Sequence, residues 1–161
     1  QAAAAAQDDG TAASRILAAS IAYREWAVMH PVQFQLIYGN PIPNYVGPVE
    51  VIAPVARLPF EGIFRDFAVA YHMGELEQPQ QHIDIPLTVR ANIDAFLNDI
   101  GLDIPYSVMY AIMSSWSHIH GMVMLELFNH ITPVIKDTEA FYQHEIISFL
   151  QVAGVKGLDT E

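Results

Sequence analysis

Apolar residues recur at spacings of three and four along most of this chain, which is the pattern of helices with one buried face. The first such stretch runs from Thr11, a good capping residue, to about Met29. His30 and Pro31 then interrupt it, because a residue before proline is driven out of the helical region while proline suits a first helical turn. We therefore expect one helix up to Met29 and a short one from Pro31 that stops at Gly39.

A second long stretch follows a proline-rich segment, 41–48, which we interpret as a loop. We expect a helix over about 51–73, with Gly74 as its C-terminal stop. Pro59 lies inside this pattern and removes a backbone donor, so a kink or a restart is expected there. The polar segment 75–82, rich in Gln and Pro, is expected to be the least ordered part of the chain.

Three further helices follow, and each begins near a residue that can cap it, in two cases together with proline. Their expected ranges and signals are 84–100 (Asp84, Pro86, closed by Gly101), about 106–130 (Asp103, Pro105, ended by Thr132-Pro133) and 138–150 (Asp137 or Thr138). No segment shows the sustained alternation of a strand. We expect a single all-α domain over 1–161, a helical bundle in which 1–10 is a linker or the tail of a connecting helix.

The helix over about 106–130 lies in a stretch with one fixed charge, Glu126, between Asp103 and Lys136. Such a helix has no solvated side, and one small domain covers only one of its faces. We therefore expect a homodimer in which this helix and the last one form a four-helix bundle with their symmetry mates. Its polar residues would be costly in hydrocarbon, so no membrane span is expected. The residues assigned to the apolar centre of the dimer interface are Met109, Ile112, Ile119, Met122, Phe141, Tyr142 and Phe149.

The composition is acidic, with 7 Lys and Arg against 18 Asp and Glu and a formal net charge of -11. The basic residues are scattered singly, whereas a nucleic-acid footprint needs them clustered, so this chain is not expected to bind DNA by itself. The absence of cysteine excludes disulfides, zinc fingers and thiol catalysis. The start QAAAAAQDDG has neither an initiator methionine nor the pattern of a signal peptide, so we expect an interior piece of a longer, cytoplasmic protein.

Two segments are more specific than a generic helix pattern. The stretch AYREWAVMHPVQFQLIYGN, over 22–40, resembles the segment Y-R-x-W-A-x-x-H-P-x-x-Y-x-L-M-F that opens the regulatory domain of many tetracycline-repressor (TetR) family regulators. The stretch WSHIHGMVMLELF resembles the signature of the WHG type of that domain, with Trp116, His120 and Gly121 at the named positions. The letters HMGEL at 72–76 resemble the usual end of the family's middle helix.

This resemblance implies an all-α domain that binds a small effector and dimerises through its last two helices. Family members carry a helix-turn-helix DNA-binding domain before the regulatory domain, and this chain departs from the pattern because it has none. The chain is then expected to be the regulatory part of a repressor, with the DNA-binding segment encoded directly before Gln1, and ligand binding is expected to release DNA. The alternative is a free-standing helical small-molecule-binding or dimerisation protein that does not bind DNA.

Aromatic side chains are more numerous than packing of a small bundle requires, and they provide the candidate ligand site. Trp116 and His120 are four apart, so the indole can stack on the imidazole, either as a packed core pair or as a cavity wall. Gly121 lowers helix stability and is tolerated where a second backbone approaches, from this bundle or from the partner. We expect a largely apolar ligand and no cofactor. The candidate residues are Tyr23, Trp26, Phe34, Tyr38, Phe60, Phe64, Phe67, Tyr71, Tyr110, Trp116 and His120.

Seven histidines raise the question of a metal site. Glu126 and His130 are four apart and could share an ion, but His118 and His120 point to different helix faces and no second Glu-x-x-His pair completes a carboxylate-bridged site. His130 also suits a helix C-terminus, where it complements the helix dipole. No nucleophile elbow, glycine-rich phosphate loop or usable carboxylate pair is visible. We therefore expect no metal site and no enzymatic activity.

Overall fold

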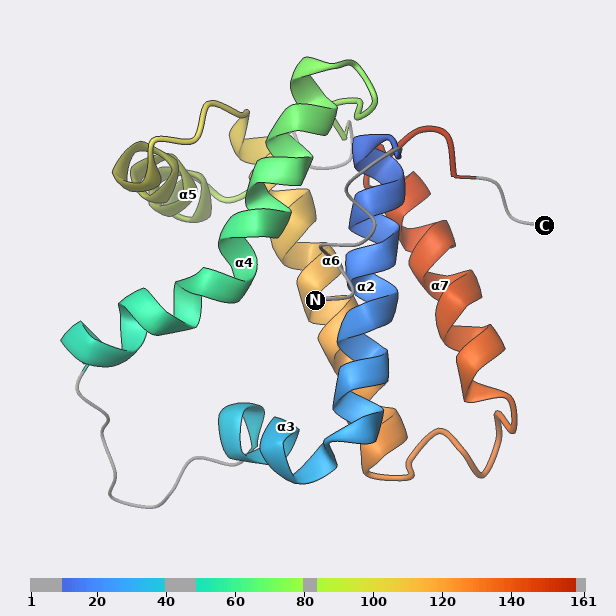
Figure 1. Ribbon diagram of the computed structural model, residues 1–161. Coiled ribbons are helices and arrows are strands. Elements are labelled where there is room, and N and C mark those ends of the chain that lie inside the picture. Colours follow the sequence, from blue (N-terminus) through green and yellow to red (C-terminus); the bar gives the residue numbers. More distant parts are fainter. Residues whose placement is uncertain (1–9, 40–48, 80–83, 159–161) are drawn as a thin grey trace.

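The computed structural model describes residues 10–39, 49–79 and 84–158, with the backbone alone for residues 49 and 51–60. The described part of the chain forms six helices and no sheet, which confirms the all-α prediction. In chain order these helices are α2 (Ala12–Met29), α3 (Pro31–Tyr38), α4 (Val49–His72), α5 (Leu87–Ile100), α6 (Tyr106–Leu127) and α7 (Thr138–Val152), as labelled in Figure 1.

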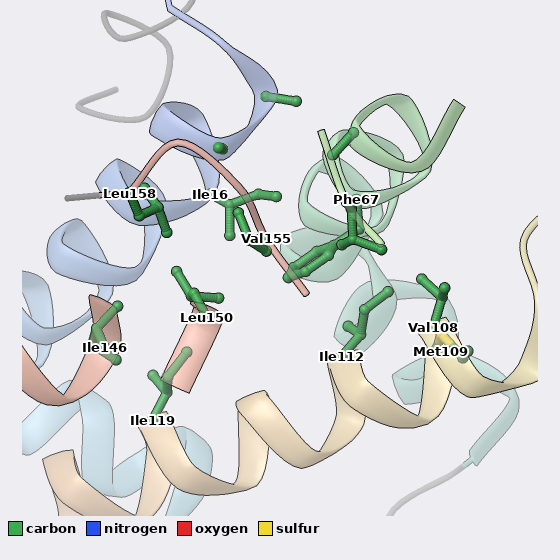
Figure 2. Packing of buried hydrophobic residues seen from close by; sticks show 14 of the residues in the cluster. Ile16, Phe67, Val108, Met109, Ile112, Ile119, Ile146, Leu150, Val155 and Leu158 are labelled. Carbon is green, nitrogen blue, oxygen red and sulfur yellow. The ribbon is translucent and has the colours of Figure 1, made fainter. Parts of the chain in front are cut away.

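The core lies where α2, α4, α6 and α7 meet, and α3 and α5 lie at its periphery (Figure 1). Ile16 of α2, Phe67 of α4, Ile112 of α6 and Leu150 of α7 are each at most 3% exposed. Figure 2 shows these side chains turned toward a common interior, together with Val155 from the segment after α7. Burying a side chain of this size stabilises the fold by about 1.5–3 kcal/mol. Contacts in the main core therefore fix the positions of α2 and α6, which also contribute residues to the candidate functional site.

Local signals at several helix ends act as the sequence predicted. Thr11 Oγ1 accepts a hydrogen bond from the Ser14 amide at 3.2 Å, which satisfies one of the free donors at the start of α2. Asp137 caps α7 in the same manner, accepting from the Ala140 amide at 2.9 Å. Gly101 ends α5 with φ at 65°, a left-handed conformation that costs glycine little.

The long helix α6 ends at Leu127, three residues earlier than expected. Asn129 adopts a left-handed conformation with φ at 58°. The His130 amide then donates to the Leu125 carbonyl at 2.8 Å and the Asn129 amide to the Glu126 carbonyl at 2.9 Å, which is the pattern of a Schellman C-cap. Asparagine tolerates this conformation, so it stops the helix before the proline that was expected to do so. Among the described residues no helix has both the length and the hydropathy of a membrane span.

Prolines at two helix starts act differently from the prediction, whereas the bend expected at Pro59 is seen. Pro86 and Pro105 are themselves the N-cap residues of α5 and α6, and neither helix start has a side-chain cap, so Asp84 and Asp103 do not cap them. The helix α4 continues through Pro59 without a restart. It does change direction along its length, as Figure 1 shows, and a missing backbone donor inside a helix favours such a bend.

The start of the segment expected to be least ordered is instead fixed by contacts with the C-terminal residues. Leu76 is 4% exposed and forms an isolated antiparallel bridge with Val155. The carboxylate of Glu75 accepts a hydrogen bond from the Ala12 amide at 2.8 Å, which ties this segment to the first turn of α2. The expectation failed here because the pairing residues are far apart in sequence. Residues 80–82 of that segment, like the predicted loop over 41–48, lie outside the described residues.

Candidate functional site

Five rings from α2, α3 and α6 meet in one place, and we call them the aromatic cluster: Tyr23, Phe34, Tyr38, Trp116 and His120. The Tyr23 ring centroid lies 5.1 Å from that of Trp116 and 5.9 Å from that of Phe34. Trp116 and His120, one turn apart on α6, have centroids 5.2 Å apart, as their spacing predicts. Edge and tilted contacts of this kind add about 0.5–1.5 kcal/mol per pair beyond burial. The two motif segments therefore contact each other directly.

A hydrogen bond inside the cluster joins Tyr23 Oη and His120 Nδ1 at 2.8 Å. Burial lowers the pKa of His120, because desolvation disfavours the charged imidazolium, so the ring is neutral at pH 7. Burial likewise raises the pKa of Tyr23 and of Tyr38, so both hydroxyls keep their protons. In the tautomer with the proton on Nε2, the phenol donates to Nδ1. The cluster is therefore uncharged, and its central polar pair is satisfied from within.

A cavity of about 60 Å³ lies against the aromatic cluster, lined by Ala19, Ser20, Tyr23, Tyr38, Ile63, Trp116 and Ile119. A drug-sized ligand occupies a site of roughly 300–1,000 Å³. The predicted site is thus present as packed rings around a small hollow, and a larger ligand requires these rings to move apart.

The structure does not bring the other predicted ligand residues into this cluster. Trp26 touches its edge, with its ring centroid 6.3 Å from that of Phe34. Phe67 belongs to the main core and is 3% exposed. The remaining candidates are Tyr71 beside His72, Tyr110 half-buried on α6, Phe64 beside Phe96, and Phe60, whose side chain lies outside the described residues.

Phe64 lines a second hollow, which lies between α4 and α5 and which we call the α4–α5 groove. Its volume is about 430 Å³, and its lining residues are Glu61, Phe64, Arg65, Phe96, Asp99, Ile100 and Leu102. This groove could not be predicted from the sequence, because its walls come from two separate segments and no motif links them.

Next to the cluster, Arg24 of α2 and Glu126 of α6 form a two-pronged ion pair, with Arg24 Nε donating to Oε2 at 2.7 Å and Nη2 to Oε1 at 2.6 Å. Thr138 Oγ1 donates to the same Oε1 at 2.7 Å, and the guanidinium lies 5.5 Å from the ring centroid of Tyr142. The two charged side chains are only 11% and 14% exposed. Desolvation alone would raise the pKa of Glu126, but the hydrogen bonds from Arg24 and Thr138 outweigh it and the net shift is downward. The pair fastens α2 to the junction of α6 and α7.

One sequence signal could have found this pair. Glu126 is the single fixed charge of an otherwise apolar helix, and a charge in such a place needs a partner. Arg24 follows Tyr23 in the first motif segment, so two consecutive residues of α2 bind two residues of α6.

The structure places five of the seven residues assigned to the dimer interface inside the chain's own core, where each is at most 8% exposed: Met109, Ile112, Ile119, Met122 and Tyr142. Phe141 and Phe149 are half-buried. The apolar side chains that α6 exposes are instead Met113 and Leu125, both 44% exposed. A Cβ added at Gly121 would meet no neighbouring atom of the described residues within 4 Å, so no other described segment of this chain supplies the close backbone expected there. These five side chains have little surface left for a partner, and both the interface residues and dimerisation itself stay predictions.

The residues considered for a metal site are engaged elsewhere or lie apart. Glu126 binds Arg24, and His130 lies beyond the end of α6. His118 stacks on Phe149 with ring centroids 4.4 Å apart, on a different side of α6 from His120. Within the described residues no three His, Asp or Glu side chains gather closely enough to hold an ion.

Comparison with known proteins agrees with this geometry. The family described as "Tetracyclin repressor-like, C-terminal domain" matches residues 16–149, which include the aromatic cluster and the Arg24–Glu126 pair. The chain is also 26% identical over 126 residues to the HTH-type transcriptional regulator Rv1816 of Mycobacterium tuberculosis (strain ATCC 25618 / H37Rv) and, equally, to the HTH-type transcriptional regulator Mb1846 of Mycobacterium bovis. Each alignment covers 76% of this chain and 53% of the relative, so the chain spans about half the length of these relatives. The chain therefore belongs to the TetR family, a non-enzymatic family of regulators, as a tetracycline-repressor-like C-terminal domain.

Proposed function

We propose that this chain is the effector-binding and dimerisation domain of a transcriptional repressor, and that a small, largely apolar molecule bound at the aromatic cluster releases the repressor from DNA. The observation that carries the proposal is the cluster itself, an uncharged aromatic wall with one internal polar pair, Tyr23 and His120. Such a wall suits an apolar ligand that makes few hydrogen bonds. Two relatives carry the name HTH-type transcriptional regulator, which supports DNA binding through a helix-turn-helix domain that this chain does not include.

Ligand binding requires the cavity at the cluster to grow, and α3 is the element that can yield most easily. Phe34 is the one fully buried side chain of this short helix, whereas Val32 and Leu36 are 67% and 82% exposed. Displacing α3 with Tyr38 would open the cluster from one side, while the Arg24–Glu126 pair keeps α2 against α6. A ligand shifts a conformational equilibrium only if its affinities for the two states differ, so it must bind the opened state more tightly than the closed one. In the opened state of the dimer, the two DNA-binding domains must then have a spacing that fits the operator poorly.

A titration with apolar compounds, followed by Trp26 and Trp116 fluorescence and by melting temperature, tests the site. Trp116→Ala should weaken a hit about tenfold or more, because truncating a central aromatic of a binding site costs at least 1.4 kcal/mol. Phe96→Ala, which changes an aromatic in the α4–α5 groove, is the matched control and should leave affinity unchanged. If folded Trp116→Ala protein binds as tightly as the parent, the effector site is not the cluster.

The regulatory part of the proposal is tested on the longer protein, with the segment encoded before Gln1 included. A hit that binds the cluster should lower the affinity of this protein for its operator in a gel-shift titration. An operator affinity that the hit leaves unchanged would contradict release of DNA and favour a binding domain without that output.

We further propose that the exposed side of α6, together with α7, meets the partner subunit. Gly121 provides a sharp test, because its added Cβ has free space within this chain and leucine is a better helix former than glycine. Gly121→Leu should therefore fold as well as the parent but prevent close approach of a second α6. Gly62→Leu, at an equally open glycine of α4, is the control. Light scattering should show dimers for the parent and the control and monomers for Gly121→Leu. A parent protein that is monomeric at micromolar concentration would contradict this proposal.

A further inference from the structure

We propose that the ligand of the aromatic cluster is a neutral, largely apolar molecule with a carbonyl group, and that the hydroxyl of Tyr38 selects it by donating a hydrogen bond to that carbonyl. This inference rests on the proposed function and deepens it, since it names the chemical class of the ligand and the residue that recognises it. Tyr38 is the last residue of α3 and lines the cavity at the cluster. Its ring centroid lies 5.2 Å from that of His120 and 6.1 Å from that of Trp116.

The side chains around this cavity leave one hydroxyl group without a partner. Ser20, Tyr23 and Tyr38 are the hydroxyl-bearing side chains among its described lining residues. Ser20 Oγ donates to the Ile16 carbonyl at 2.8 Å, and Tyr23 Oη is paired with His120 Nδ1 at 2.8 Å. The Tyr38 hydroxyl forms no hydrogen bond with any described residue, although burial raises its pKa and so withdraws it in part from water. An acceptor on a ligand would supply the missing hydrogen bond.

The position of Tyr38 couples this hydrogen bond to opening of the cluster. The present cavity of about 60 Å³ is far smaller than the roughly 300–1,000 Å³ of a site for a drug-sized ligand. Tyr38 lies at the end of the short helix that moves in the proposed opening, in which Phe34 is the one fully buried side chain. A bond from Tyr38 to such a ligand can therefore form only in the opened state, and it adds to the affinity of that state alone. Tyr38 would thus determine which bound molecules keep the cluster open.

The surroundings of Tyr38 favour a neutral carbonyl over a carboxylate. Tyr23 and His120 are uncharged. The guanidinium of Arg24 lies next to the cluster, but its Nε and Nη2 both donate to Glu126. A carboxylate would lose its hydration at the cluster without gaining a counter-charge from any of these groups. The formal net charge of -11 would also repel an anion at longer range.

Three probes with one carbon skeleton separate the effect of the carbonyl from that of shape: tetralin without a polar group, 1-tetralone with a ketone, and tetralin-1-carboxylate as the anion. Titration of this chain, followed by tryptophan fluorescence, gives the three affinities. 1-Tetralone should bind more tightly than the carboxylate. A carboxylate that binds as tightly as 1-tetralone, or a complete lack of binding by 1-tetralone, would overturn the proposed ligand class.

The Tyr38→Phe variant tests the hydroxyl directly. It should weaken 1-tetralone about 2- to 10-fold, which is the contribution of a neutral hydrogen bond, and leave the affinity for tetralin unchanged. Tetralin is the decisive comparison, because a purely structural role of Tyr38 would change both affinities alike. The melting temperature of the free variant should match that of the parent, since the hydroxyl has no partner among the described residues. Equal losses for the two compounds, or an unchanged affinity for 1-tetralone, would contradict the role of Tyr38.

Two further variants separate this inference from the proposed function. Tyr71→Phe removes a hydroxyl outside the cluster, beside His72, and should change neither affinity. Trp116→Ala should weaken both tetralin and 1-tetralone, because it truncates a wall of the cavity. If Trp116→Ala weakens both compounds but Tyr38→Phe does not distinguish them, the cluster stands as the effector site and only the role of Tyr38 is wrong. If folded Trp116→Ala protein binds both compounds as tightly as the parent, the site itself is wrong.

Discussion

The aromatic cluster and the α4–α5 groove are two hollows of one domain with opposite construction. The cluster joins α2, α3 and α6 and leaves a cavity of about 60 Å³, with Tyr23 Oη and His120 Nδ1 paired to each other and its ionisable groups neutral. The groove lies between α4 and α5, measures about 430 Å³ and carries charges of both signs at its surface. Burial accounts for part of the contrast, because polar groups withdrawn from water must be neutral or paired, and the cluster's rings are half-buried or buried while Glu61, Arg65 and Asp99 of the groove are exposed.

The two hollows should also respond differently to a bound ligand. A ligand at the cluster must push packed rings apart, so its binding is coupled to movement of the helices that hold them. A ligand in the groove finds its space already formed and needs no such movement. Of the two, the closed site is therefore the one suited to transmit a signal through the domain.

The largest expected effect comes from loosening the closed region at its ion pair. Glu126→Ala should destabilise the chain by about 3–5 kcal/mol, because it leaves the guanidinium of Arg24 buried without its partner. Arg65→Ala, which removes an exposed guanidinium of the groove, should change stability by less than about 0.5 kcal/mol. Urea unfolding of both variants measures the contrast.

A double variant shows whether the loss comes from the orphaned charge. Arg24→Met combined with Glu126→Leu removes both charges, and it should recover most of the stability lost in Glu126→Ala. A double variant as unstable as the single one would assign the loss to packing and leave the ion pair a minor contribution.

Signals that act over a few residues could be read from the sequence, and long-range pairings could not. Thr11 and Asp137 cap helices and Gly101 stops one, because each acts on the turn next to it. The early end of α6 at Asn129 was not predicted, because asparagine is a weaker sequence signal for the left-handed conformation than glycine. The contact of Leu76 with Val155 was missed because nothing near either residue indicates the other.

Part of the candidate site could also be predicted from local sequence signals, and part could not. The resemblance drew attention to Trp116 and His120, and the aromatic excess pointed to Tyr23, Phe34 and Tyr38, which the structure does bring together. Phe64 and Phe67 were wrongly grouped with them, because one α4 stripe cannot show which of its residues face the main core and which face α5. Which α6 residues are exposed in this chain could not be predicted either, since a helix apolar all round gives no register.

A smaller effect is expected from the hydrogen bond inside the cluster. Tyr23→Phe should cost about 1–2 kcal/mol, because it leaves His120 Nδ1 without its partner in a part-buried site. Tyr71→Phe removes a hydroxyl that forms no hydrogen bond with the described residues, and it should be nearly neutral. Thermal unfolding of the two variants compares them, and equal losses would show that the Tyr23 hydroxyl contributes nothing specific.

The pH dependence of stability should reveal the neutral imidazole of the cluster. Burial lowers the pKa of His120 from its ordinary 6.5, so just below pH 6.5 the unfolded chain binds more protons than the folded one. The contribution of His120 to stability is thus fully present above pH 6.5 and is lost as the pH falls toward the folded pKa. His120→Gln should flatten this part of the profile, and His144→Gln, at an exposed position of α7, is the control for removing a histidine. A His120→Gln profile parallel to that of the parent would contradict the assignment.

The smallest effect is expected on the stability of the open region. Asp99→Asn and Arg65→Gln alter exposed side chains of the groove, so each should shift the free energy of unfolding by less than about 0.5 kcal/mol. A shift this small is expected where a hollow is formed by surface side chains that the core does not need. Denaturant unfolding of the two variants and the parent measures it. A loss of several kcal/mol in either variant would show that these charges hold α5 against α4, and the groove would then have to be regarded as part of the packed structure, like the cluster.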